Sequence, residues 1–281
     1  MKLEPVNPFD YHQYCHRILV FAEWMTEYVQ KNKIDGYIGW LDQFKRYKYN
    51  SGRGSWKDGV KDRCDFHKKL TSIVSKSNNQ QLVNIANSII LDFGGIPERY
   101  KYELKDAGGI RQALVILSNE TNKSGLFTPP SIESLFNFTP RHRIASHSKI
   151  YEMFDPHKWA IYDARVATAL VCLVWQFWKQ KGVKIEPASL TFPVPSRNKR
   201  NWKRPHPDEF PRLYGYKKGQ ASLAFIYCSW LLRLVAEILR ADPKYSCPAT
   251  TEHANEIAPL DANWQVHHVE MALWMLGDKE F

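Results

Sequence analysis

One aspartate in the chain occupies a position where a reactive group would be held firmly. Residues 154–166 contain a turn at Asp155-Pro156, a short apolar extended piece and then Asp163, after which an apolar helical run begins. An aspartate there accepts hydrogen bonds from the free amides of the first helical turn, which is the ordinary role of a helix cap. The apolar helix behind it is expected to be buried, so the carboxylate would also face outward from a rigid element, as a catalytic acid requires. At this point both roles, cap and catalyst, stay open.

Basic residues with aromatic rings between them could meet a polyanion. The formal net charge is +10 and the isoelectric point is about 9.3, a balance that favours partners such as nucleic acid. Residues 44–50 would contact phosphates if extended, but on a helix they would form a basic face with the rings turned inward. The proline-rich segment 186–219 is either a nucleic-acid contact or a solvated surface loop. The cations expected to contact DNA are Lys45, Arg46, Arg141, Arg143, Lys149, Arg165, Arg197, Lys199, Arg200 and Lys203.

The elements that must position these groups are helices. Apolar residues recur at helical intervals through most of the chain, and strands are few at most, so the sequence predicts an all-α, mainly helical protein. Glycine pairs and prolines mark the turns between the helices. The predicted helices cover residues 14–29, 73–91, 110–117, 129–136, 144–154, 164–179, 221–239 and 264–276.

Composition and motifs exclude several classes of protein. With 281 residues, of which 44% are hydrophobic, the chain can bury a large core. Its five cysteines are scattered without a C-x-x-C pair and its N-terminus lacks a signal-peptide pattern, so a cytoplasmic location is expected. The longest apolar runs, residues 166–178 and 221–232, are shorter than a membrane span needs, which predicts no membrane partner. The adjacent His267 and His268 point to different helix faces, and no metal site is expected.

Residues 139–170 resemble the helix-hairpin-helix superfamily of DNA glycosylases. The resemblance lies in a helix, the Asp155-Pro156 turn, the apolar piece Ala160-Ile161-Tyr162 and the following Asp163. It implies that Asp163 is the catalytic carboxylate and that two helical lobes enclose a DNA-binding cleft. Residues 1–281 would form one glycosylase-like unit. Its first lobe would span residues 36–153, and its second would join residues 1–35 to 154–281 and carry the basic loop 186–219.

Three departures from the family pattern narrow the expected chemistry. The glycine-rich hairpin is replaced by Thr139-Pro140-Arg141-His142-Arg143, so side chains such as Arg141 and Arg143 would bind the phosphate. The lysine that bifunctional members use would fall near Arg143 or Ile144, and neither of these is a lysine. Hydrolysis without lyase activity is therefore favoured. Only Cys228 and Cys247 lie late in the chain, so no iron-sulfur cluster or other cofactor is expected.

The resulting hypothesis is a monomeric, monofunctional DNA glycosylase that acts on double-stranded DNA. The target base would leave the stack and enter a pocket, for which Trp159, Tyr162 and Trp40 are candidates, although such rings more often pack in a core. Base-excision repair and defence against phages with modified DNA are both compatible with this chemistry. The alternative is a non-catalytic DNA-binding protein on the same scaffold, with Asp163 as a cap only. A nuclease is disfavoured because no carboxylate cluster at metal-site spacing stands out.

Overall fold

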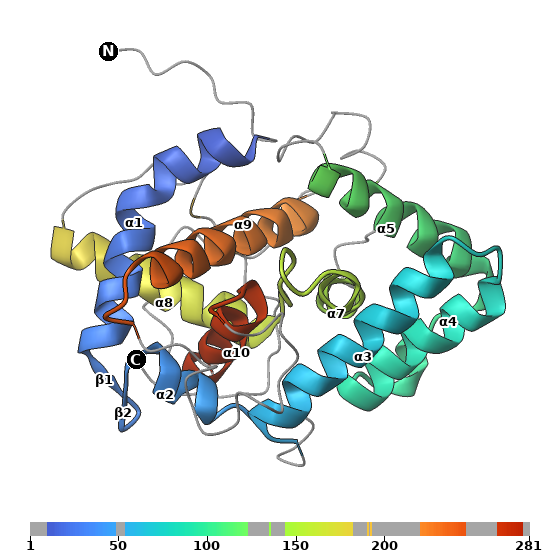
Figure 1. The fold of residues 1–281 in the computed structure, drawn as a ribbon, viewed down its shortest axis with the longest axis horizontal. Helices are drawn as coiled ribbons and strands as arrows, with labels where there is room; N and C mark the ends of the chain where they lie inside the picture. The colour runs from blue at the N-terminus through green and yellow to red at the C-terminus, as the bar shows by residue number, and fades with distance from the viewer. Residues whose placement is uncertain are drawn as a thin grey trace.

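The computed structural model describes residues 10–48, 54–122, 135, 144–181, 190, 192, 220–245 and 263–277. This part of the chain is mostly helical (Figure 1), which confirms the predicted all-α class. A short antiparallel ribbon pairs Lys33 with Ile38 and Ile34 with Tyr37. The elements are α1 (Tyr11–Lys31), β1 (Lys33–Ile34), β2 (Tyr37–Ile38), α2 (Gly39–Lys45), α3 (Trp56–Val74), α4 (Asn79–Ser88), the π-helical turn η2 (Ile89–Phe93), the 3₁₀ turns η3 (Glu98–Tyr100) and η4 (Leu104–Asp106), α5 (Ala107–Asn122), α7 (Ile144–Phe154), α8 (Ala164–Lys181), α9 (Gln220–Ala241) and α10 (Val266–Leu276).

Helices α7 and α8 and the segment between them follow the sequence prediction. Helix α7 covers the expected residues 144–154, and α8 begins immediately after Asp163. Asp155 forms the predicted turn: its side chain accepts a hydrogen bond from the amide of His157 at 3.2 Å, and its carbonyl accepts one from Trp159 at 2.9 Å. Residues 159–163 are neither helix nor strand, so the chain runs straight from this turn to the start of α8.

The helix predicted over residues 73–91 is confirmed for its larger part, as α4 and η2, but its beginning is wrong. Helix α3 instead begins at Trp56, after a capping box between Ser55 and Asp58, and ends at Val74. A new helix, α4, begins after Asn78, whose side-chain oxygen accepts a hydrogen bond from the amide of Gln81 at 2.9 Å. Polar side chains in the linking residues 75–78 offer the backbone such local partners, and they therefore favour a break over a continuous helix.

The helices pack around one connected cluster of buried apolar side chains. Helix α1 lies along α9, and α10 packs against α2, α8 and α9. On the other side of the molecule α3 packs against α7, α4 and α5, and α7 also contacts α9 (Figure 1). Helix α7 therefore stands between the α3–α4–α5 group and the group formed by α1, α8, α9 and α10.

Helix α9 is longer than the sequence predicted. Its residues Ser222–Ala241 have a mean hydropathy of 1.6 and are long and apolar enough to cross a membrane by length and composition alone. However, 78% of that stretch is buried inside the protein. A buried central helix of a globular core has the same composition, and α9 occupies such a position against α1, α7 and α10.

Several predicted features lie outside the described residues. They include most of the helix expected at residues 129–136 and, apart from Leu190 and Phe192, most of the basic loop 186–219. The predicted DNA-binding cations that fall there are Arg141, Arg143, Arg197, Lys199, Arg200 and Lys203.

Candidate functional site

Asp163 caps helix α8, as its position in the sequence predicted. Its Oδ1 accepts hydrogen bonds from the amides of Arg165 at 2.9 Å and Val166 at 3.2 Å. The segment that leads to it is fixed as well, since the amide of Tyr162 donates to the hydroxyl of Ser148 at 3.0 Å. The carboxylate is thereby held by its own helix and by the neighbouring α7.

The second oxygen of Asp163 has partners that a cap does not need. Its Oδ2 accepts a hydrogen bond from the indole nitrogen of Trp274 at 3.2 Å and lies 3.8 Å from the ammonium nitrogen of Lys149. The Asp163 side chain is 19% exposed, so it keeps contact with solvent. Asp10 provides a comparison within the chain, because it caps α1 through the same two types of amide bond, at 2.9 and 3.1 Å. Among the described residues the side chain of Asp10 makes no further hydrogen bond or ion pair, so the contacts at Oδ2 distinguish Asp163 from an ordinary cap.

Lys149 lies inside the protein, although the sequence analysis had counted it among the cations that contact DNA. Its side chain is 7% exposed, and its ammonium also donates to the carbonyl oxygen of Ala145 at 3.2 Å. Gly94 makes room for it: a Cβ atom on Gly94 would lie 2.6 Å from Cδ and 2.9 Å from Cε of Lys149. The geometry thus directs this ammonium toward Asp163. The family's lysine position, counted back from Asp163, did not predict that an ammonium would lie so near this carboxylate.

Trp274 reaches Asp163 because the end of α10 is docked on the start of α8. The guanidinium of Arg165 lies over the Trp274 ring, 3.7 Å from its centroid. Gly277, which follows α10, lies so close to the carbonyl oxygen of Arg165 that a Cβ atom there would overlap it. Arg165, another predicted DNA contact, is therefore stacked on Trp274. The sequence analysis missed Trp274, and nothing in the local sequence separates it from the nine other tryptophans.

A buried ion cluster lies behind this site and joins three helices. Arg63 of α3 donates from Nε to Oε1 of Glu152 on α7 and from Nη2 to Oε2 of Glu270 on α10, the latter at 2.7 Å. All three side chains are fully buried. Burial is the main cause that raises the pKa of Glu270 to about 8. The attraction of Arg63 acts in the opposite direction, and the negative charges of Glu152 and Asp163 offset that attraction. Two carboxylates share one guanidinium, and the raised pKa favours the protonated form of Glu270.

The three aromatic residues predicted for a base pocket lie in the core. Trp40 is 0% exposed and donates its indole hydrogen to the carbonyl oxygen of Thr26 at 3.0 Å. Trp159 is 1% exposed and packs against Phe225, and Tyr162 is 0% exposed. None of these rings offers an open face on which a base could stack. The correction has a simple cause, since large rings gain most by filling a helical core.

The two predicted DNA contacts near residue 45 differ in their surroundings. Lys45 is exposed at the end of α2, whereas Phe44 and Tyr47 beside it are buried. The helix ends at Lys45, so the rings are turned inward as expected for a helix although the segment beyond Lys45 is not helical. Arg46 is held by two exposed neighbours: its guanidinium lies 2.5 Å from a carboxylate oxygen of Asp35 and 4.5 Å from the ring centroid of Tyr37. A partner that bound Arg46 would have to compete with this surface ion pair, whereas Lys45 makes no such contact among the described residues.

The site therefore unites one carboxylate, one ammonium and one indole N–H at the start of a helix. A carboxylate fixed in this way can stabilise a developing positive charge or accept a proton from water. Among the described residues no group of three histidine, cysteine, aspartate or glutamate side chains could hold a metal ion. Comparison of the chain with known protein families, with curated proteins and with solved structures finds no match.

Proposed function

We propose that the chain is a monofunctional DNA glycosylase in which Asp163 is the catalytic carboxylate. The substrate would be a damaged or modified base that has left the stack of double-stranded DNA. Breaking its bond to deoxyribose builds positive charge on the sugar, and a carboxylate beneath the sugar stabilises that charge and orients the attacking water. The product would be an abasic site.

The observation that carries the proposal is the environment of the second oxygen of Asp163. The amide bonds to Oδ1 only show that Asp163 is a cap, since Asp10 makes the same bonds. At Oδ2, Trp274 adds a hydrogen-bond donor from a helix 111 residues away, and Lys149 of the preceding helix adds an ion pair at 3.8 Å. Donors fixed in advance around a reacting carboxylate lower the cost of reorganisation during catalysis.

The contacts of Asp163 also agree with a site between two lobes. In the proposed division Lys149 belongs to residues 36–153, whereas Asp163 and Trp274 belong to the second lobe. The carboxylate would then lie where the lobes meet, and DNA would cross the cleft between them. Exposed cations such as Lys45 would contribute to phosphate binding.

The test is an assay for abasic sites. The protein is incubated with DNA from several sources, including phage genomes with modified bases, and strand breaks are compared before and after alkali. Breaks that appear only after alkali support hydrolysis by a glycosylase. Breaks before alkali would instead indicate a nuclease, or a lyase step in which the amine of Lys149 attacks the sugar. Activity on damaged cellular DNA or on modified phage DNA would separate repair from defence.

Two matched variants test the role of Asp163. Asp163→Asn keeps a good cap for α8 but removes the charge, so we expect excision to be abolished while the fold and DNA binding remain. Asp10→Asn makes the same change at the cap of α1 and should leave excision unchanged. Full activity of Asp163→Asn would refute the catalytic role. DNA binding without excision by the wild-type protein on every substrate would favour the alternative, a non-catalytic DNA-binding protein.

A further inference from the structure

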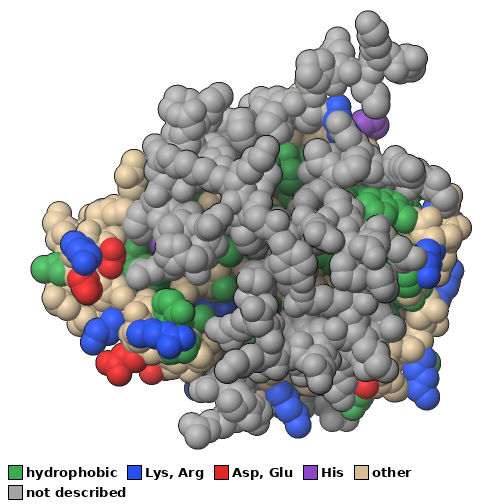
Figure 2. Space-filling view, turned by 180° about the vertical axis from the view of Figure 1, so that it is seen from behind, with side chains coloured by type: hydrophobic (Ala, Val, Ile, Leu, Met, Phe, Trp, Pro, Cys, Tyr) green, Lys and Arg blue, Asp and Glu red, His purple; other side chains and the backbone are tan. Residues whose placement is uncertain are grey.

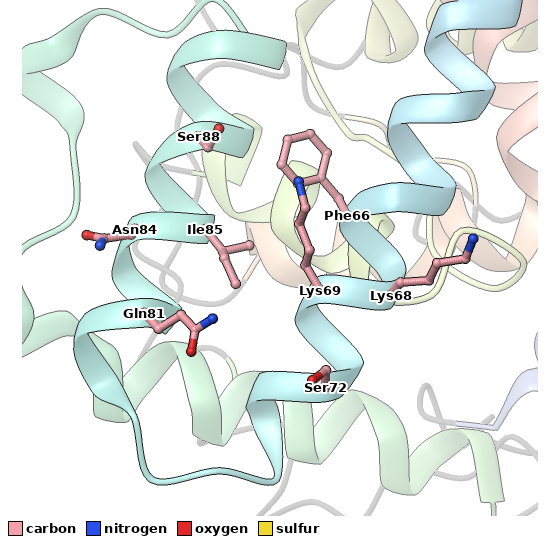
Figure 3. A pocket seen from close by; sticks show the side chains of 8 residues that line it. All are labelled: Phe66, Lys68, Lys69, Ser72, Gln81, Asn84, Ile85 and Ser88. Atoms are coloured by element: carbon pink, nitrogen blue, oxygen red, sulfur yellow. The ribbon is translucent and has the colours of Figure 1, made fainter.

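A furrow separates helices α3 and α4 on the surface of the molecule. It has a volume of about 580 Å³, and its walls include Phe66, Lys69 and Ser72 of α3 and Gln81 and Ile85 of α4 (Figure 3). Figure 3 shows that Ile85 faces α3 and that the amide of Gln81 points toward the furrow. The furrow does not share the side chains that contact Asp163, which come from α7 and α10.

The charged groups along the furrow are mainly cations. The ammonium of Lys69 lies 5.3 Å from the ring centroid of Phe66, and the exposed Lys68 next to it extends from α3 on the side away from α4 (Figure 3). Lys76, just beyond α3, donates from its ammonium to the hydroxyl of the lining residue Ser72 at 3.3 Å. None of the residues that line the furrow carries a carboxylate. Carboxylates do lie near its walls: Asp92 accepts a hydrogen bond from Ser88 at 2.7 Å, and α3 carries Asp62 and Asp65 one turn before Phe66 and Lys69.

A ring and an apolar side chain lie beside these cations. Phe66 and Ile85 are half-buried, so part of each surface remains open in the furrow. A ligand that suits both features carries repeated negative charges and flat apolar groups. An open furrow between two helices also admits a chain that continues past both ends, because no residue of the described part of the chain is found to close it over a small molecule.

We propose that the furrow between α3 and α4 binds a single strand of nucleic acid. Lys68, Lys69 and Lys76 contact the phosphates, and an unpaired base stacks on the exposed part of Phe66, a pairing that every base can make. A single strand suits the site better than a duplex, because a paired base has no free face for the ring. This binding does not depend on the chemistry proposed for Asp163.

The test is fluorescence anisotropy with a labelled oligothymidylate of about 12 nucleotides, measured over a range of salt concentrations. The Lys68→Ala/Lys69→Ala double variant should weaken binding on the order of tenfold and lower the log–log salt slope by about 1.4, because two phosphate contacts are lost. Phe66→Leu keeps an apolar side chain but removes the ring, and it should weaken binding about tenfold with an unchanged slope. Lys105→Ala removes an exposed lysine paired with Glu103 outside the furrow, and it should bind like the wild type.

Three outcomes would overturn the inference. In the first, the double variant binds as tightly as Lys105→Ala. In the second, the lysine changes weaken binding but Phe66→Leu does not. In the third, a duplex of the same length binds equally well. The second and third would show a general basic surface. Figure 2 shows why this control matters, since lysine and arginine side chains are seen at both edges of that view of the molecule. Because the oligonucleotide is unmodified and Asp163→Asn can serve as the background, the result is independent of whether the protein excises bases.

Discussion

Replacing Glu270 with glutamine should make the stability of the fold less dependent on pH. Glu270 shares the guanidinium of Arg63 with Glu152, and its pKa is raised from 4.5 to about 8, mainly by burial. A carboxyl whose pKa is raised in the folded state binds its proton more tightly there than in the unfolded chain. Its contribution to stability is therefore complete below about pH 4.5 and is lost as the pH rises through about 8. Glutamine imitates the protonated form at every pH, so the variant lacks this loss.

The size of the effect follows from the shift in pKa. Between pH 4.5 and 8 the wild type should lose about 1.4 kcal/mol of unfolding free energy per pH unit relative to Glu270→Gln. For a chain of this size that corresponds to roughly 3 °C in the midpoint of thermal unfolding per pH unit. Circular dichroism melts of both proteins at several pH values across this window measure the difference directly. We expect the two proteins to match near the acidic end and the variant to be the more stable at the alkaline end.

Two further variants complete this experiment. Glu98→Gln changes an exposed carboxylate whose side chain is 78% accessible, and its melting profile should follow that of the wild type. Glu152→Gln leaves Glu270 as the only carboxylate on Arg63, so Glu270 should ionise more easily and the loss of stability should move to lower pH. A constant difference between wild type and Glu270→Gln at all pH values, or one that favours the wild type as the pH rises, would refute the shared-proton reasoning.

Two more predictions concern the contact between α8 and α10. Trp274→Phe keeps a ring beneath Arg165 but removes the N–H that donates a hydrogen bond to Asp163. The rate of excision in a single turnover should fall roughly tenfold to a hundredfold, with little change in melting temperature. An unchanged rate would contradict the proposed role of this donor. Gly277→Ala places a Cβ atom against the carbonyl oxygen of Arg165, so denaturant melts should show a loss on the order of 2 kcal/mol. Gly108→Ala is its control, because a Cβ atom there meets nothing within 4 Å, and a glycine-to-alanine change in a helix should stabilise by about 0.5 to 1 kcal/mol.

The fold could be predicted where local sequence signals agree with the packing. Helix α7 and the start of α8 were correct because apolar periodicity, the Asp155-Pro156 turn and the capping aspartate all indicate the same boundaries. Helix α3 was missed because its buried face includes Arg63, a charge that hydrophobic periodicity counts as exposed. The break before α4 was missed because the new helix begins with a single side-chain hydrogen bond, which Asn78 accepts from the amide of Gln81. Periodicity detects buried stripes, but it does not detect an individual cap or a buried ion.

In the candidate site, too, the local contacts could be predicted from the sequence and the contacts between distant residues could not. The position of Asp163 depends on neighbours two and three residues away, and the sequence predicted it. Its contact with Trp274 joins residues 111 positions apart, and the contact between Arg63 and Glu270 spans 207. Only the packing of complete helices brings such pairs together. The aromatic pocket residues were predicted from residue type alone, which does not separate a stacking surface from a core, and all three proved to be buried.

Helix α10 takes part both in the ion cluster at Arg63 and in the surroundings of Asp163. Glu270 and Trp274 lie four residues apart and therefore on the same side of the helix, and Gly277 follows at its end. One shift of α10 would change the ion cluster at Arg63 and the hydrogen bond to Asp163 together. The cap bonds of Asp163 would survive that shift, because they belong to α8 alone. The place of the carboxylate is thus set by α8, whereas the donors around its second oxygen depend on α7 and α10 being docked, so reactivity could be lost while the cap of α8 stays intact.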